Sequence, residues 1–168
     1  MYMNAILLMG IFGGFAAIGI IVYVYQRERK RFFESLAAFC KHLSSEISFS
    51  KNQIDVVITH YQSSYPSRPF QQLLTQYKDI LDARLDITRE SLDALMWQRL
   101  KPEEASQVSN FFLELGRFGV REEIEKLDGA HELFNSHHET AQARLKKESI
   151  LWLKLAIITG IASVIMLM

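Results

Sequence analysis

Residues Ala5 to Tyr25 read AILLMGIFGGFAAIGIIVYVY, and residues Gln26 to Arg31, which follow them, read QRERKR. The first run holds about 21 residues without a charge, so as a helix it covers a hydrocarbon core of about 30 Å. Basic residues next to a span tend to stay on the cytoplasmic side. The sequence therefore predicts a transmembrane helix over residues 1–25, with the N-terminus outside and the following chain starting inside.

A cleaved signal peptide is the alternative interpretation of this run. It would need a basic start, a shorter apolar centre and small residues at the cleavage site. Met1 to Asn4 carries no positive side chain, and Val24-Tyr25-Gln26 offers no small residue to a peptidase. The sequence favours an uncleaved span.

Small residues within the run suggest where another helix could pack. Gly10 and Gly14 are four residues apart, as are Gly13 and Ala17, and such pairs allow close approach of two helices. Glycine is also common in membrane helices without such a role. We predict Gly10 and Gly14 as candidate packing positions.

The C-terminal residues 150–168 predict a second transmembrane helix. Lys154 is their one charged residue, and it lies about one turn from the start, where it can reach the head groups. Trp152 suits the interface, and the basic residues just before the run repeat the topology signal. Residues 26–149 are therefore expected to form a cytoplasmic domain between two spans of a multi-pass membrane protein.

Composition agrees once the chain is divided in this way. The 168 residues have zero formal net charge and are 49% hydrophobic, but the charged residues all fall between Arg27 and Lys154. The middle segment is long enough for one domain with its own core. Cys40 is the single cysteine, so the chain cannot form an internal disulfide and suits a reducing compartment.

Between the spans, apolar residues recur at three- and four-residue steps, which is typical of helices with one buried face. Six segments show this pattern: 32–47, 54–61, 70–81, 92–100, 108–115 and 124–145. Their expected starts and ends are marked by Ser50, Pro69, Thr88, Pro102 and Gly116. No segment alternates like a strand. We expect an all-α fold, an up-and-down bundle of about six helices between two transmembrane helices, the first and last bundle helices being continuous with the spans.

Three histidines on the last predicted helix raise the question of a metal site. His131 and His138 are seven residues apart, and His137 adjoins the second of them. Helical metal sites usually use three- or four-residue spacing, so we interpret these residues as part of a solvated helix face. We expect no metal.

Other chemistry finds little support in the sequence. There is no phosphate-binding glycine loop, and no serine is placed by sequence beside an activating base. Cys40 lies on an apolar stripe, where a buried thiol is expected rather than a nucleophile. Basic residues cluster only beside the spans, which argues against nucleic-acid binding. We expect no enzymatic activity, cofactor, nucleic acid or small-molecule substrate.

The order of motifs resembles a known family. Leu36, Leu43, Glu46 and Ile47 have the spacing Leu-x6-Leu-x-x-Glu-Ile after a span and basic residues, and Ser91-Leu92 and then Leu115-Gly116 follow. This arrangement, with a short C-terminal span, resembles stage III sporulation protein AB of endospore-forming bacteria along the whole chain. The family tends to show an Asp three residues after the glycine and a Gln one turn later, where this chain has Gly119 and Glu123. A helix cap that used the Asp must be made differently here.

The resemblance implies a role in the channel complex that joins mother cell and forespore. Family members are similar to the cytoplasmic helical domain of the inner-membrane platform proteins of type II secretion and type IV pilus machines. The implied partners are the lipid bilayer, a cytoplasmic secretion-type ATPase and other channel subunits. The implied location is the outer forespore membrane, with the bundle on the mother-cell side.

Two other functional classes stay open at this stage. A membrane-anchored helical adaptor or sensor unrelated to secretion would also have a non-catalytic bundle between spans. A metal-dependent enzyme using His131 and His138 is the third hypothesis. Metal analysis of the purified protein and replacement of both histidines would test it.

Overall fold

The computed structural model describes residues 2–50, 56–58, 61, 67–83, 86–96 and 98–167. It divides into two compact units. Unit 1 comprises Met1–Glu28 and Thr140–Met168, and unit 2 comprises Arg29–Glu139. Every labelled element within the described residues is a helix, so the predicted all-α class is confirmed.

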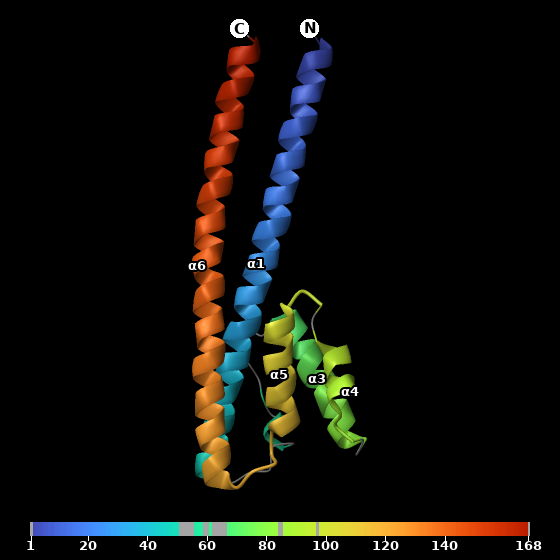
Figure 1. Cartoon of the computed structure of the whole chain (residues 1–168), viewed down its shortest axis with the longest axis vertical. Coiled ribbons are helices and arrows are strands. Elements are labelled where there is room, and N and C mark those ends of the chain that lie inside the picture. The colour runs from blue at the N-terminus through green and yellow to red at the C-terminus, as the bar shows by residue number, and fades with distance from the viewer. Residues whose placement is uncertain are drawn as a thin grey trace. The chain divides into compact units, whose positions relative to one another are not determined.

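Five labelled helices account for most of the described chain: α1 (Tyr2–Ser50), α3 (Arg68–Asp82), α4 (Arg89–Leu95), α5 (Pro102–Glu114) and α6 (Val120–Leu167) (Figure 1). Residues 56–58 are also helical. The first helix continues without a break from the first apolar run through the basic residues, and the last helix continues into the second apolar run. Each of these helices is therefore continuous with one of the two apolar runs, and the assignment of the runs as membrane spans stays a prediction.

Across the described ranges, no helix has both the length and the apolar character needed to cross a membrane.

The core of unit 2 forms where the apolar faces of all five helices meet. The stripe predicted from the 32–47 spacing is buried, with Phe32, Phe33, Leu36, Phe39, Cys40 and Leu43 fully inaccessible. Aromatic rings connect the helices through edge-to-face and stacked contacts. Phe32 of α1 meets Phe70 of α3 at a centroid distance of 6.1 Å, and Phe112 of α5 meets Tyr77 of α3 at 4.8 Å.

Helix starts follow the local sequence signals. The side chain of Ser67 caps α3 by accepting a hydrogen bond from Phe70 N, and Pro69 lies in the first turn, as predicted. The predicted cap at Thr88 is confirmed, and Ser91 completes it as a capping box. Pro102 begins α5, also as predicted, because its missing N–H costs nothing in the first turn.

The predicted end of the fourth helix at Leu100 is wrong. Helix α4 ends at Leu95, and Met96 takes an extended conformation with ψ of 136°. Both Met96 and Leu100 are buried in the core. The chain therefore leaves the helix early and turns, which brings these two apolar side chains inward, and burial outweighs local helix preference.

Two sequence signals lie partly outside the described residues. Ser50 is the last residue of α1, whereas its predicted capping partner Gln53 lies outside. The predicted loop from Tyr61 to Pro69 is described only at Tyr61 and from Ser67 onward.

Unit 1 contains the first part of α1 and the last part of α6, with both chain ends at the same end of the unit (Figure 1). The two helices approach closely at Gly19, where an added Cβ would lie 3.3 Å from the ring of Trp152. Gln26 Nε2 donates to Glu148 Oε1 at 3.3 Å. At Gly14 an added Cβ would meet nothing within 4 Å, and the surroundings of Gly10 lie outside the description, so packing by these two residues stays a prediction.

Candidate functional site

A buried ion pair joins helix α1 to helix α5. Arg29 is 2% exposed, and its Nε donates to Glu104 Oε2 at 3.2 Å. A second guanidinium N–H donates to Glu104 Oε1, so the pair is bidentate. Glu104 Oε2 also accepts a hydrogen bond from Lys101 N at 3.2 Å, which caps the helix. Glu104 thus orders the start of α5 and fixes it to α1.

Sequence reasoning missed this ion pair. It interpreted Arg29 only as one member of the basic group after the first span, and Glu104 only as a first-turn acid. A signal was present, because Arg29 lies four residues before Phe33 and seven before Leu36, on the same helical stripe. A charged residue on a core stripe indicates a buried partner.

His137 lies beside the ion pair and connects α6 to α1 and α5. Its ring stacks on Phe33 at a centroid distance of 4.9 Å, and its Nε2 lies 2.7 Å from Gln107 Oε1. Its Nδ1 is 3.9 Å from Glu104 Oε1. Burial lowers the pKa of His137 below its ordinary value, although the nearby Glu104 carboxylate acts in the opposite direction. Because the amide oxygen of Gln107 accepts, Nε2 of His137 carries the hydrogen of this contact.

The other two histidines of α6 bond to the main chain of α1. His131 Nδ1 lies 2.9 Å from Ala37 O, and His138 Nδ1 lies 3.3 Å from Lys30 O. Because a carbonyl oxygen accepts, each Nδ1 carries the hydrogen. The interpretation of these residues as a solvated face is wrong, since all three are half-buried and hydrogen-bonded between helices. No group of three potential ligands is placed to hold a metal in the part of the chain that was described.

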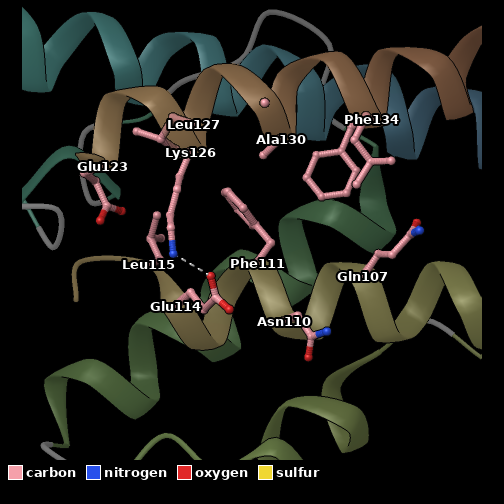
Figure 2. A pocket seen from close by; sticks show the side chains of 12 residues that line it. Gln107, Asn110, Phe111, Glu114, Leu115, Glu123, Lys126, Leu127, Ala130 and Phe134 are labelled. Atoms are coloured by element: carbon pink, nitrogen blue, oxygen red, sulfur yellow. Dashed lines mark hydrogen bonds and ion pairs between the residues drawn. The ribbon is translucent and has the colours of Figure 1, made fainter. Parts of the chain in front are cut away.

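A groove of about 260 Å³ lies between α5 and α6 in unit 2 (Figure 2). Its floor is apolar: Phe111 and Phe134 meet edge-to-face with centroids 5.5 Å apart, and Leu127 and Ala130 extend the surface. Phe111 was predicted as a core residue, but it is half-buried because one side of its ring faces the groove. On the α6 side the lining includes two small residues, Gly129 and Ala130.

Charged residues bound the groove. Lys126 Nζ of α6 donates to Glu114 Oε2 of α5 at 3.0 Å, a contact that joins the two helices (Figure 2). The same ammonium lies 3.2 Å from the ring centroid of Phe118. Gln107 and Asn110 continue the α5 side with neutral amides. The rim is therefore polar above an apolar floor, which is the usual composition of a protein-binding surface.

Glu123 occupies one end of the groove and is 4% exposed. Its Oε1 accepts a hydrogen bond from Gly116 N at 2.9 Å, whereas its Oε2 is buried without a hydrogen-bond partner. Gly116 has φ of 80°, which favours glycine and ends α5 with a tight turn. Glu123 therefore links the first turn of α6 to the α5–α6 turn. Its partner Gly116 N belongs to that turn, so this contact is not a cap of α6.

Tyr77 lies near the same carboxylate. Burial, and secondarily the negative charge of Glu123, raises the pKa of Tyr77 to about 12. The neutral hydroxyl donates to Phe112 O at 3.1 Å. This hydrogen bond fixes α3 to α5 behind the groove.

The residues singled out by the family resemblance have structural positions. Leu36, Leu43 and Ile47 are buried in the core, and Glu46 is half-buried. Leu115 is half-buried at the end of α5, although a core position was predicted, because the turn at Gly116 leaves it on the groove wall. Cys40 is fully buried, as expected, and burial raises the pKa of its thiol well above the usual range.

One of three comparisons with known proteins gives a match. The family model described as stage III sporulation protein AB matches residues 4–168, nearly the whole chain. No curated protein and no solved structure shows significant similarity to the chain.

Proposed function

This chain belongs to the stage III sporulation protein AB family, and from this premise we propose that it is a non-enzymatic membrane component of the channel complex between mother cell and forespore. Membership makes it a stage III sporulation protein. The more specific role is that its helical bundle couples a cytoplasmic secretion-type ATPase to the membrane assembly. The observation that carries the proposal is the family match across the full length of the chain.

The membrane attachment is part of the proposal. Its support is the sequence, in which two long apolar runs at residues 5–25 and 150–168 are each flanked by basic residues on the side of the bundle. We infer a hairpin with both chain ends outside and the bundle in the mother-cell cytoplasm, at the outer forespore membrane.

Cysteine labelling tests this topology. Because Cys40 is fully buried, a single cysteine placed at Met168 or at Ser64 is the reactive thiol in each variant. An impermeant thiol reagent is expected to label Met168→Cys from outside the membrane of origin, and to label Ser64→Cys only after lysis. The opposite pattern would reverse the proposed orientation.

The absence of catalysis is also part of the proposal. Two features support it among the described residues. The single thiol is buried with a raised pKa, and the three α6 histidines form hydrogen bonds to other helices. Their proposed role is to fix helix positions in a bundle that transmits position or force.

A pull-down tests the coupling role. A tag inserted at Ser64 allows capture of the full chain from detergent-solubilised membranes of sporulating cells, followed by mass spectrometry. Recovery of a secretion-type ATPase with other channel subunits is the expected result. If channel subunits are present in the input but absent from the eluate, and signalling or division proteins are recovered instead, a membrane-anchored adaptor or sensor replaces the proposal.

A further inference from the structure

The α5–α6 groove has the size for protein side chains rather than for a small molecule. Its volume of about 260 Å³ falls below the roughly 300–1,000 Å³ of pockets that enclose drug-sized ligands. Its floor of Phe111, Leu127 and Phe134 is apolar, and Leu133 on the α6 side is 40% exposed. Such a surface suits an amphipathic helix that inserts one or two apolar side chains.

The charge around the groove identifies the kind of segment that fits. By helical spacing, Glu103 lies one turn before Gln107 on the α5 rim, and Glu122 lies one turn before Lys126 on the α6 rim. Both are exposed. The rim base Lys126 already pairs with Glu114.

The buried end of the groove adds to this negative charge. Glu123 Oε2 is a buried carboxylate oxygen without a hydrogen-bond partner. This oxygen is closed to solvent, so the carboxylate contributes its charge to the end of the groove and not a contact with a partner. The groove thus combines an apolar floor with an acidic rim and an acidic end.

We propose that the α5–α6 groove is the docking site for a basic amphipathic helix of the cytoplasmic partner, a statement that rests on the coupling function proposed above. Apolar side chains of that helix occupy the space beside Phe111 and Phe134. Its lysine or arginine side chains face the exposed Glu103 and Glu122. The contact face of the bundle is therefore the α5–α6 side.

Gly129 offers a direct test because it lines the groove and an added Cβ there would meet nothing within 4 Å. The Cβ of a leucine at this position meets no atom of the protein, and leucine favours helix more than glycine does, so we expect the variant to fold. Its side chain occupies the space that the partner needs. Gly129→Ala adds only a methyl group, and Glu132→Leu places the same leucine at an exposed α6 position outside the groove.

The experiment measures binding of the purified secretion-type ATPase to the full chain in detergent micelles. Gly129→Leu is expected to raise the dissociation constant at least tenfold. The dissociation constants of Gly129→Ala and Glu132→Leu should stay within about threefold of that of the unmodified protein. Leu133→Gln, a second groove variant, is expected to weaken binding as well. Binding should also weaken with rising ionic strength, and the double variant Glu103→Gln/Glu122→Gln should flatten that dependence.

The possible failures are distinguishable. If the unmodified protein binds the ATPase and both Gly129→Leu and Leu133→Gln bind equally well, the docking site is wrong while the coupling function stands. If Gly129→Leu instead converts a self-associated protein to a monomer, the groove joins copies of this chain and the proposal is overturned. If the unmodified protein does not bind the ATPase at all, the coupling function fails and the docking proposal falls with it.

Discussion

Replacing Glu104 by alanine should destabilise the bundle more than most single changes, because it leaves Arg29 buried without its partner. The guanidinium is 2% exposed and donates two hydrogen bonds to this one carboxylate. Breaking a buried ion pair by removing one partner typically costs about 3–5 kcal/mol. The same carboxylate also accepts from Lys101 N, so the cap of α5 is lost as well.

The buried thiol of Cys40 provides the assay. It is the single cysteine and is fully inaccessible, so a thiol reagent reacts with it only when unit 2 opens. When closing is fast compared with labelling, the labelling rate follows the opening equilibrium. A loss of about 3–5 kcal/mol then speeds labelling by between about a hundredfold and a few thousandfold, since each 1.4 kcal/mol or so is a factor of ten.

Two matched variants separate the ion pair from general damage. Glu104→Gln keeps one acceptor oxygen for Arg29 and replaces the other by an amide donor, so it should lose less stability than Glu104→Ala. The double variant Arg29→Met/Glu104→Leu removes both charges and should label within about tenfold of the unmodified protein, because apolar replacement of a whole buried pair is often neutral or stabilising. Labelling of Glu104→Ala at the unmodified rate would refute the assignment of this pair to the interior.

The same labelling assay tests other sites. Phe112→Ala removes a fully buried ring that contacts Tyr77, and it should lower the free energy of unfolding by about 3–5 kcal/mol. Gly116→Ala places a residue with a Cβ at a backbone φ of 80° and should lower the free energy of unfolding by about 1–2 kcal/mol. An unchanged labelling rate would contradict the turn geometry. His137 predicts a pH dependence: its folded pKa lies below the ordinary 6.5, so the unfolded chain binds the proton more readily and stability falls as the pH drops below 6.5. His137→Gln should reduce this loss of stability, and an equally steep loss in that variant would assign the effect to other groups.

Most of the bundle could be predicted from the sequence because its helices carry strong periodic signals. The apolar stripe that begins at Phe32 and ends near Ile47 is buried as expected. The starts at Thr88 and Pro102 were predictable for a similar reason, since a cap and a proline act within one turn of the chain. The end of α4 was not predictable in this way, because the chain becomes extended at Met96 and buries this side chain in a core formed by distant segments.

The candidate site was less predictable because it depends on pairs far apart in the chain. Arg29 and Glu104 are 75 residues apart, and each had a sufficient local explanation in the sequence. The α5–α6 groove depends on how two helices meet and on the small residues Gly129 and Ala130 in its lining. Periodicity assigns a residue to a helix face, but it does not specify how completely the facing helix covers it.

The two histidine contacts between α6 and α1 also determine how the helices resist sliding. His131 and His138 bond to the main-chain oxygens of Ala37 and Lys30, so the acceptors stay in place whichever side chains occupy those two positions. Seven residues separate both the donors and the acceptors, which places the contacts about 10 Å apart along the helices. A shift of α6 by one helical turn, about 5 Å, would break both at once. A force along the axis of either helix within unit 2 is therefore transmitted to the other, and the two helices resist it together.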